Sequence, residues 1–210
     1  MKHYGKLTLA LIAGWFIFAL SASALHLFRN DSQRVGIAVA IAALTPIIVF
    51  ALWFALSENF RQFTLSLNPR ILTGAQFWRI IGFTFILLQA RNLLPAIFAL
   101  PAGYGDMAIG ATATLAAWQL TSPSHRNSFI LWQALGITDL VIAVSLGTTA
   151  RLLDPSGPSM LRLTVLPLSL VPTFLVPLFT IFHVICIAQA TKWQSASSYT
   201  GQVARTARAL

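Results

Sequence analysis

Acidic residues are scarce in this chain. Only five occur in 210 residues: Asp31, Glu58, Asp106, Asp139 and Asp154. Charged residues of both signs make up 9% of the sequence, whereas soluble domains carry roughly 25%. So little polar surface cannot cover a globule in water, and 57% of the residues are hydrophobic. These features exclude a soluble globular domain and predict a multi-pass membrane protein solvated by the lipid bilayer.

Cysteine is almost absent as well. The single Cys186 lies in an apolar run, which excludes both a disulfide framework and a thiolate metal site. Histidine pairs with metal-ligand spacing are also lacking, so we expect no metal. The cofactor stays unknown, because His183 fits either a packed core histidine or a single axial ligand of haem.

Basic residues are not scarce, and the formal net charge is +9. In a soluble protein this excess would indicate nucleic-acid binding. Here the Lys and Arg residues lie mostly at the edges of apolar runs, where they contact lipid phosphates. We therefore expect a lipid bilayer as partner and no nucleic acid.

Six apolar runs are long enough to cross a bilayer, which takes about 20 helical residues. The expected fold is all-α, with one domain over residues 1–190 that forms a bundle of six transmembrane helices. The expected spans lie near residues 7–28, 35–57, 74–94, 103–121, 128–149 and 166–190. The first run is too long for a cleaved signal peptide. Residues 191–210 form a polar, basic tail that we expect to be mobile.

Two prolines complicate the middle of the chain. Pro95 and Pro101 fall within residues 91–103, so this segment could be broken or re-entrant instead of a simple turn between spans.

The positive-inside rule gives an orientation for the six spans. Nine Lys and Arg residues, including Lys2 and Arg79, fall on one side, and five, including Arg91, fall on the other. We therefore predict that both termini are cytoplasmic. The expected location is the inner membrane, if the source is bacterial.

Two aspartates lie inside predicted spans, where an acid is costly by a few kcal/mol. Each shares a helical stripe with small residues, and such stripes mark close helix contacts. The stripes are Asp106, Gly110, Ala113 and Ala117 in one span and Gly136, Asp139, Ala143 and Gly147 in the next. Both acids are therefore expected to face the interior, in the outer half of the bundle, with Arg91 within reach of one or both.

This arrangement has two interpretations. It is either a buried ion pair that holds three helices together or a polar pocket that binds a small molecule or ion. One arginine and two acids leave a surplus negative charge, which favours the pocket. We expect binding or translocation of a small solute or ion, with Arg91 and Asn92 as donors and Asp106 and Asp139 as acceptors. Tyr104 and the segment Pro95–Pro101 would line its outer mouth.

Another function class is also open. The chain has little mass outside the predicted membrane region and no complete catalytic set. It could therefore be an accessory subunit of a larger membrane complex, or form a homo-oligomer.

The motif "GYGD", Gly103 to Asp106, resembles the GxGD motif of intramembrane aspartyl proteases such as the prepilin peptidases. The resemblance implies a second catalytic aspartate, either Asp31 or Asp139, that would share a proton with Asp106 and activate water. Ala108 stands where prepilin peptidases usually have a lysine.

A longer pattern, "LPAIFALPAGYGDMAIGATA" followed by "WQALGITDLVIAVSLG", is similar to an uncharacterised group of bacterial polytopic inner-membrane proteins. The similarity covers the third to fifth expected spans. It implies a membrane protein and gives no activity.

Overall fold

A computed structural model of the chain describes residues 2–29 and 36–193. Within these two ranges every regular element is a helix, which confirms the all-α prediction for the described part of the chain. In chain order the elements are α1 Lys2–Ala24, α2 Ile37–Leu56, α3 Glu58–Leu65, α4 Pro69–Gly74, η1 Ala75–Gly82, α5 Phe83–Ala90, α6 Ala96–Gln119, η2 Pro123–His125, α7 Arg126–Leu153, η3 Met160–Thr164, η4 Val171–Leu175 and α8 Val176–Ala190.

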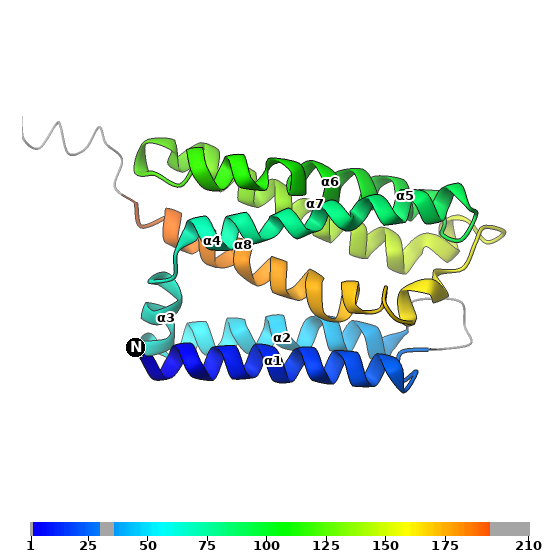
Figure 1. Cartoon of the computed structure of the whole chain (residues 1–210), viewed down its shortest axis with the longest axis horizontal. Coiled ribbons are helices and arrows are strands. Elements are labelled where there is room, and N and C mark those ends of the chain that lie inside the picture. Colours follow the sequence, from blue (N-terminus) through cyan, green and yellow to red (C-terminus); the bar gives the residue numbers. More distant parts are fainter. Residues whose placement is uncertain (1, 30–35, 194–210) are drawn as a thin grey trace, which may run out of the picture.

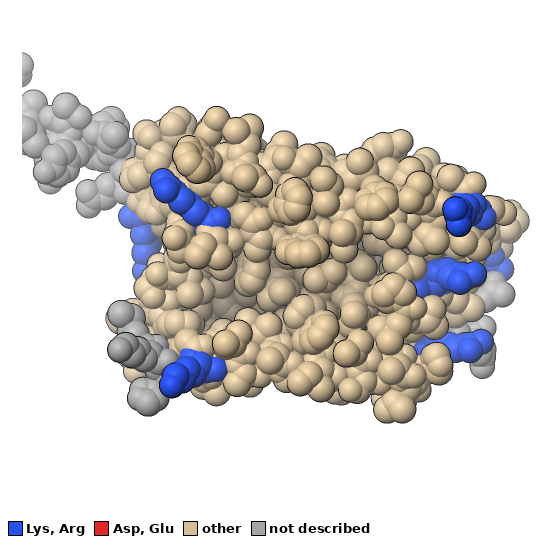
Figure 2. All heavy atoms as spheres, viewed as in Figure 1, with Lys and Arg blue, Asp and Glu red and all other residues tan. Residues whose placement is uncertain are grey.

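Five helical segments in the described ranges are long and apolar enough to cross a membrane, which is consistent with a multi-pass membrane protein. They are Tyr4–Ala24, Ile37–Leu56, Pro69–Ala90, Pro123–Leu153 and Val171–Ala190. The surface of the bundle agrees with this, because Leu9 is 70% exposed and Leu131 is 61% exposed. On the face that Figure 2 shows, basic side chains lie only at the two ends of the bundle.

The third predicted span has different limits from those expected. It extends over Pro69–Ala90, not 74–94, and is a continuous rod of α4, η1 and α5. Asn68 begins the rod, since its side chain accepts a hydrogen bond from the Arg70 amide while Pro69 occupies the first helical position. Both features are standard signals of a helix N-terminus.

The segment 91–103 consists of a turn followed by the first residues of α6, and Pro101 does not interrupt that helix. α5 ends in a Schellman motif: Leu93 N–H donates to Leu88 O and Asn92 N–H to Gln89 O, both at 2.8 Å. Asn92 has a φ of 56°, the left-handed conformation that this cap requires. The chain turns there, and α6 then runs without interruption from Ala96 to Gln119.

The helices pack in three groups (Figure 1). α6 contacts the α4–η1–α5 rod on one side and α7 on another. α8 lies between this group and the α1–α2 pair, and α2 contacts both α8 and η4. Pro177 cannot donate to the carbonyl of Thr173, four residues earlier, and the indole of Trp15 in α1 donates to it instead at 3.0 Å.

Two stretches depart from α-helical geometry. η1 is a 3-10 helix of eight residues in the middle of the α4–η1–α5 rod, and η4 is a short π-helix just before α8. Long 3-10 stretches within a helix and single π turns both occur often at functional sites. η1 and η4 line the same cavity, which is described next.

Candidate functional site

Arg79 lies at the centre of a buried charge cluster. It belongs to η1, and the residue is only 2% exposed. Its Nε donates to Asp106 Oδ1 at 2.7 Å, and its Nη2 donates to Asp139 Oδ2. Both contacts are ion pairs, so one guanidinium joins the rod, α6 and α7. All three residues lie near the midpoints of these helices.

The remaining nitrogen of Arg79 contacts the fourth helix of the cluster. Nη1 lies 3.2 Å from Gly136 O and 3.3 Å from His183 Nε2. An arginine can only donate hydrogen bonds, so His183 Nε2 accepts and its proton resides on Nδ1. Nδ1 then donates to Gln133 Oε1 at 2.5 Å, and Gln133 Nε2 donates to Thr73 Oγ1 at 2.9 Å.

His183 is therefore a packed histidine in this arrangement. Both ring nitrogens contact protein groups, the residue is fully buried, and the ring lies 5.8 Å from that of Trp132. Neither nitrogen is directed at the cavity as a ligand for haem iron. Within residues 2–29 and 36–193 no group of three or more His, Cys, Asp or Glu residues could hold a metal ion.

One guanidinium faces two carboxyl groups, so the cluster contains one more acidic group than basic groups. The two acids are not sealed from their surroundings, because their side chains are 14% and 15% exposed. Among the hydrogen bonds of the described residues, Asp106 Oδ2 has no partner. That oxygen remains available to a donor.

Asp106 faces a cavity of about 310 Å³ between the rod on one side and η4 and α8 on the other. Arg79 and Asp106 supply its charged groups. Apolar side chains form most of the remaining wall, and they include Trp78, Phe85, Leu140, Leu168, Val171 and Phe179. Asp139 is not among the lining residues, so the two acids of the cluster have different surroundings. A small molecule with an apolar body and a polar head would fit these walls.

Glycines allow the helices to bring these charges together. A Cβ on Gly105 would overlap the carboxylate of Asp139, and one on Gly136 would overlap the ring of His183. A Cβ on Gly110 would lie 2.5 Å from the backbone nitrogen of Ile80, so α6 rests directly on the backbone of η1. Close approach of this kind is the usual role of small residues between membrane helices.

The predicted arginine partner was wrong. Arg91 is exposed at the turn after α5, and within the described ranges Arg79 is the residue that pairs with both acids. The reason is the start of the third rod at Pro69, which moves Arg79 to its midpoint and Arg91 beyond its end. Asp106 lies near mid-length of α6 and not close to its outer end as expected, because α6 begins at Ala96 instead of residue 103.

The other predicted site residues also lie away from the cluster. Asn92 caps α5 through its backbone, and Tyr104 is 60% exposed on the outside of α6. Asp31, one of the alternatives for a catalytic aspartate, lies outside the described residues.

The protease interpretation stays a prediction. An aspartyl protease needs two carboxylates that share one proton. Here both Asp106 and Asp139 form ion pairs with Arg79, which lies on another helix. The glycines of "GYGD" have a packing role, since a Cβ on Gly103 would lie 2.7 Å from Ile86 Cγ1.

Sequence reasoning missed Arg79, Gln133 and Thr73 as members of the cluster. The pair Asn68–Pro69 was the available signal for Arg79, because a helix that starts there places Arg79 about 15 Å along a span at 1.5 Å per residue. Gln133 and Thr73 gave no comparable signal, since their role depends on contact with His183 across the bundle.

A protein-family model described as Domain of unknown function (DUF8737) matches residues 34–190. The chain belongs to this family. The matched region contains the whole charge cluster and the cavity, whereas α1 precedes it. No curated protein and no solved structure matches the chain.

Proposed function

We propose that the chain is a six-span protein of the inner membrane with both termini on the cytoplasmic side. α6 would be the sixth span in addition to the five apolar segments. With 24 residues it is about 36 Å long at 1.5 Å per residue, enough for a hydrocarbon core of about 30 Å. It also packs along η1, α5 and α7, which themselves belong to apolar segments.

The function that the geometry favours is binding of a small solute with an apolar body and a positively charged or hydrogen-bond-donating head. The observation that carries this proposal is Asp106, which is held by Arg79 through one oxygen and lines an apolar cavity with the rest of its carboxylate free. The surplus negative charge of the cluster favours a cation over an anion.

Translocation would add one step. Arg79 contacts both acids, and only Asp106 lines the cavity. A cation that binds Asp106 would compete with Arg79 for that carboxylate and weaken this ion pair, while Asp139 would keep Arg79 neutralised. Such a change would loosen α6 from η1, and η1 has the irregular geometry that a hinge needs.

The test uses benzylammonium, an apolar ring with a cationic head, as a probe on the detergent-extracted full-length protein. Isothermal titration calorimetry would measure its binding to the unmodified protein, to Asp106→Asn and to Asp139→Asn. Both variants remove one negative charge from the cluster, but only Asp106 lines the cavity. We expect Asp106→Asn to weaken binding at least tenfold and Asp139→Asn to retain most of it.

Equal losses in the two variants would mean that the net charge of the cluster, not a site at Asp106, attracts the cation. No binding to the unmodified protein, with both variants less stable to heat, would instead indicate a cluster that only holds the helices together.

A further inference from the structure

A second polar site lies at the opposite end of α8 from η4. Gln189 is 5% exposed, and its Nε2 approaches three backbone carbonyls: Leu67 O at 2.7 Å, Leu65 O at 3.2 Å and Thr64 O at 3.4 Å. These acceptors determine the orientation of the amide, because a flipped amide would place its oxygen against three oxygens. Oε1 consequently points away from the carbonyls, and it is buried without a hydrogen-bond partner in the described structure.

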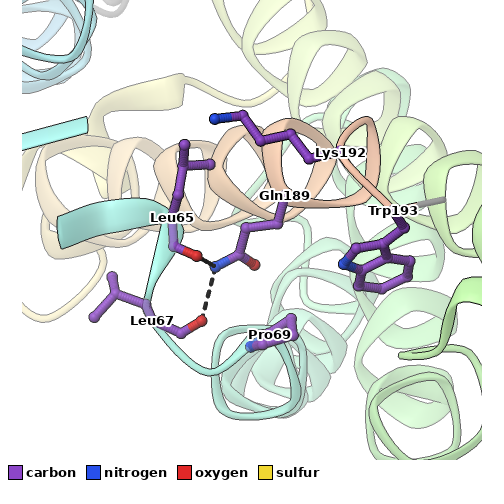
Figure 3. A pocket seen from close by; sticks show the side chains of 6 residues that line it. All are labelled: Leu65, Leu67, Pro69, Gln189, Lys192 and Trp193. Atoms are coloured by element: carbon purple, nitrogen blue, oxygen red, sulfur yellow. Dashed lines mark hydrogen bonds between the residues drawn. The ribbon is translucent and has the colours of Figure 1, made fainter. Parts of the chain in front are cut away.

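This unpartnered oxygen lies beside a pocket of about 210 Å³. Figure 3 shows the six residues that line it: Leu65, Leu67, Pro69, Gln189, Lys192 and Trp193. The indole of Trp193 is held by stacking on Phe129, with ring centres 5.1 Å apart and an interplanar angle of 26°. Its nitrogen lies on the edge of the ring that faces Gln189 (Figure 3).

The pocket thus offers two kinds of polar group. Gln189 Oε1 needs a donor, because a buried acceptor left without one is unfavourable. The Trp193 indole N–H and the Lys192 ammonium are donors, and both residues line the pocket. A ligand that satisfies all three must carry both an anionic acceptor and a donor.

We propose that this pocket binds a phosphate ester that carries a hydroxyl or ammonium group. The phosphate would accept from the Lys192 ammonium and the Trp193 indole, and the hydroxyl or ammonium would donate to Gln189 Oε1. Both the headgroup of a phospholipid and a soluble phosphate ester have this chemistry. The site lies where the apolar α8 ends, the position at which a lipid phosphate meets a spanning helix.

The experiment is native mass spectrometry of the detergent-extracted full-length protein with added phosphatidylglycerol or phosphatidylcholine. Both lipids carry a phosphate, but only the glycerol headgroup has hydroxyl donors for Gln189 Oε1. We expect the unmodified protein to retain one phosphatidylglycerol per chain, roughly tenfold more tightly than phosphatidylcholine, because only phosphatidylglycerol gives the buried Gln189 Oε1 a donor. Addition of glycerol 3-phosphate identifies the source of the ligand.

Three variants accompany this comparison. Trp193→Phe keeps an aromatic ring that can stack on Phe129 and removes the indole N–H, and Lys192→Gln removes the charge. Each should weaken phosphatidylglycerol retention about tenfold. Lys6→Gln is the control, because Lys6 is exposed at the same end of the bundle and does not line the pocket.

Displacement of the lipid by glycerol 3-phosphate would show that the pocket accepts a soluble ester, and no displacement would assign it to lipid. Either result supports the site. Equal retention of the two lipids by the unmodified protein would overturn the proposal, and this comparison needs no variant to fold. A loss in Lys6→Gln as large as that in Lys192→Gln would also overturn it, since general attraction to anionic lipid would then suffice.

Discussion

At the scale of single residues, Arg79 has the greatest influence on the interior. A planar guanidinium presents five N–H donors in a rigid fork, and here they reach two carboxylates, one carbonyl and one imidazole on three different helices. A lysine in the same place would be a point charge and could not hold these positions together. The arginine is therefore both the counter-ion of the acids and the link between the helices.

Arg79→Met is expected to destabilise the protein by roughly 3–5 kcal/mol, because it leaves two partly buried carboxylates close together with no counter-ion. The triple variant Arg79→Met, Asp106→Asn, Asp139→Asn should recover most of that loss, since no buried charge then remains unpaired. Thermal melting of the detergent-extracted proteins, followed by the fraction that stays monodisperse on size exclusion, measures both. A triple variant as unstable as Arg79→Met would show that the hydrogen bonds of Arg79, and not its charge balance, hold the helices.

The spacing of small residues predicted that both aspartates face the interior, but it did not identify Arg79 as their partner. That step depended on the first residue of the third rod, a difference of five residues between 74 and Pro69. The unbroken apolar stretch after Gly74 obscured this boundary, because hydropathy alone does not register a helix start marked by Asn68 and Pro69.

At the scale of helices, α6 approaches its neighbours through glycine. Gly105→Ala should therefore push the carboxylate of Asp139 aside and separate α6 from α7, with a loss of roughly 1–3 kcal/mol and weaker benzylammonium binding. Gly14→Ala in α1 is the matched control, because no atom lies within 4 Å of the added methyl group. Alanine favours helix over glycine by about 1 kcal/mol, so this control should be neutral or more stable.

A comparison of the melting temperatures of these two variants separates the effect of helix–helix packing from the effect of helix propensity. If Gly105→Ala were as stable as Gly14→Ala, α6 and α7 would have room to move apart, and the close approach would not position the acids.

The described elements differ in how well sequence could predict them. The expected span 35–57 agrees closely with α2, which extends over Ile37–Leu56. Its residues form a long apolar run, so hydropathy alone was enough to locate the helix. α6 was expected to begin at 103 but begins at Ala96, since Pro95 precedes it and acts as a start signal instead of a break. The irregular η1 and η4 were not predictable, because they depend on contacts across the bundle.

At the scale of the whole molecule, the apolar surface and the positions of the charged side chains are consistent with a multi-pass membrane protein. Figure 2 shows basic side chains at both ends of the bundle on one face, and the buried Arg79 is paired with acids inside it. The family match from residue 34 to residue 190 covers α2 to α8, and α1 packs on that unit in part through the bond from Trp15 to Thr173.

Single cysteines can test the six-span topology without removal of the native thiol, because Cys186 is fully buried. Arg91→Cys lies in the turn before α6, Ser124→Cys lies in the turn after it, and Ser156→Cys follows α7; all three positions are exposed. In sealed, right-side-out membrane vesicles, a membrane-impermeant maleimide should label Arg91→Cys and Ser156→Cys but not Ser124→Cys. Inverted vesicles should give the opposite pattern. The first change removes a positive charge from the side predicted to carry fewer, so it reinforces the expected orientation. Labelling of Arg91→Cys and Ser124→Cys from the same side would mean that α6 does not cross, and the Asp106 cavity would then need a different route to solution.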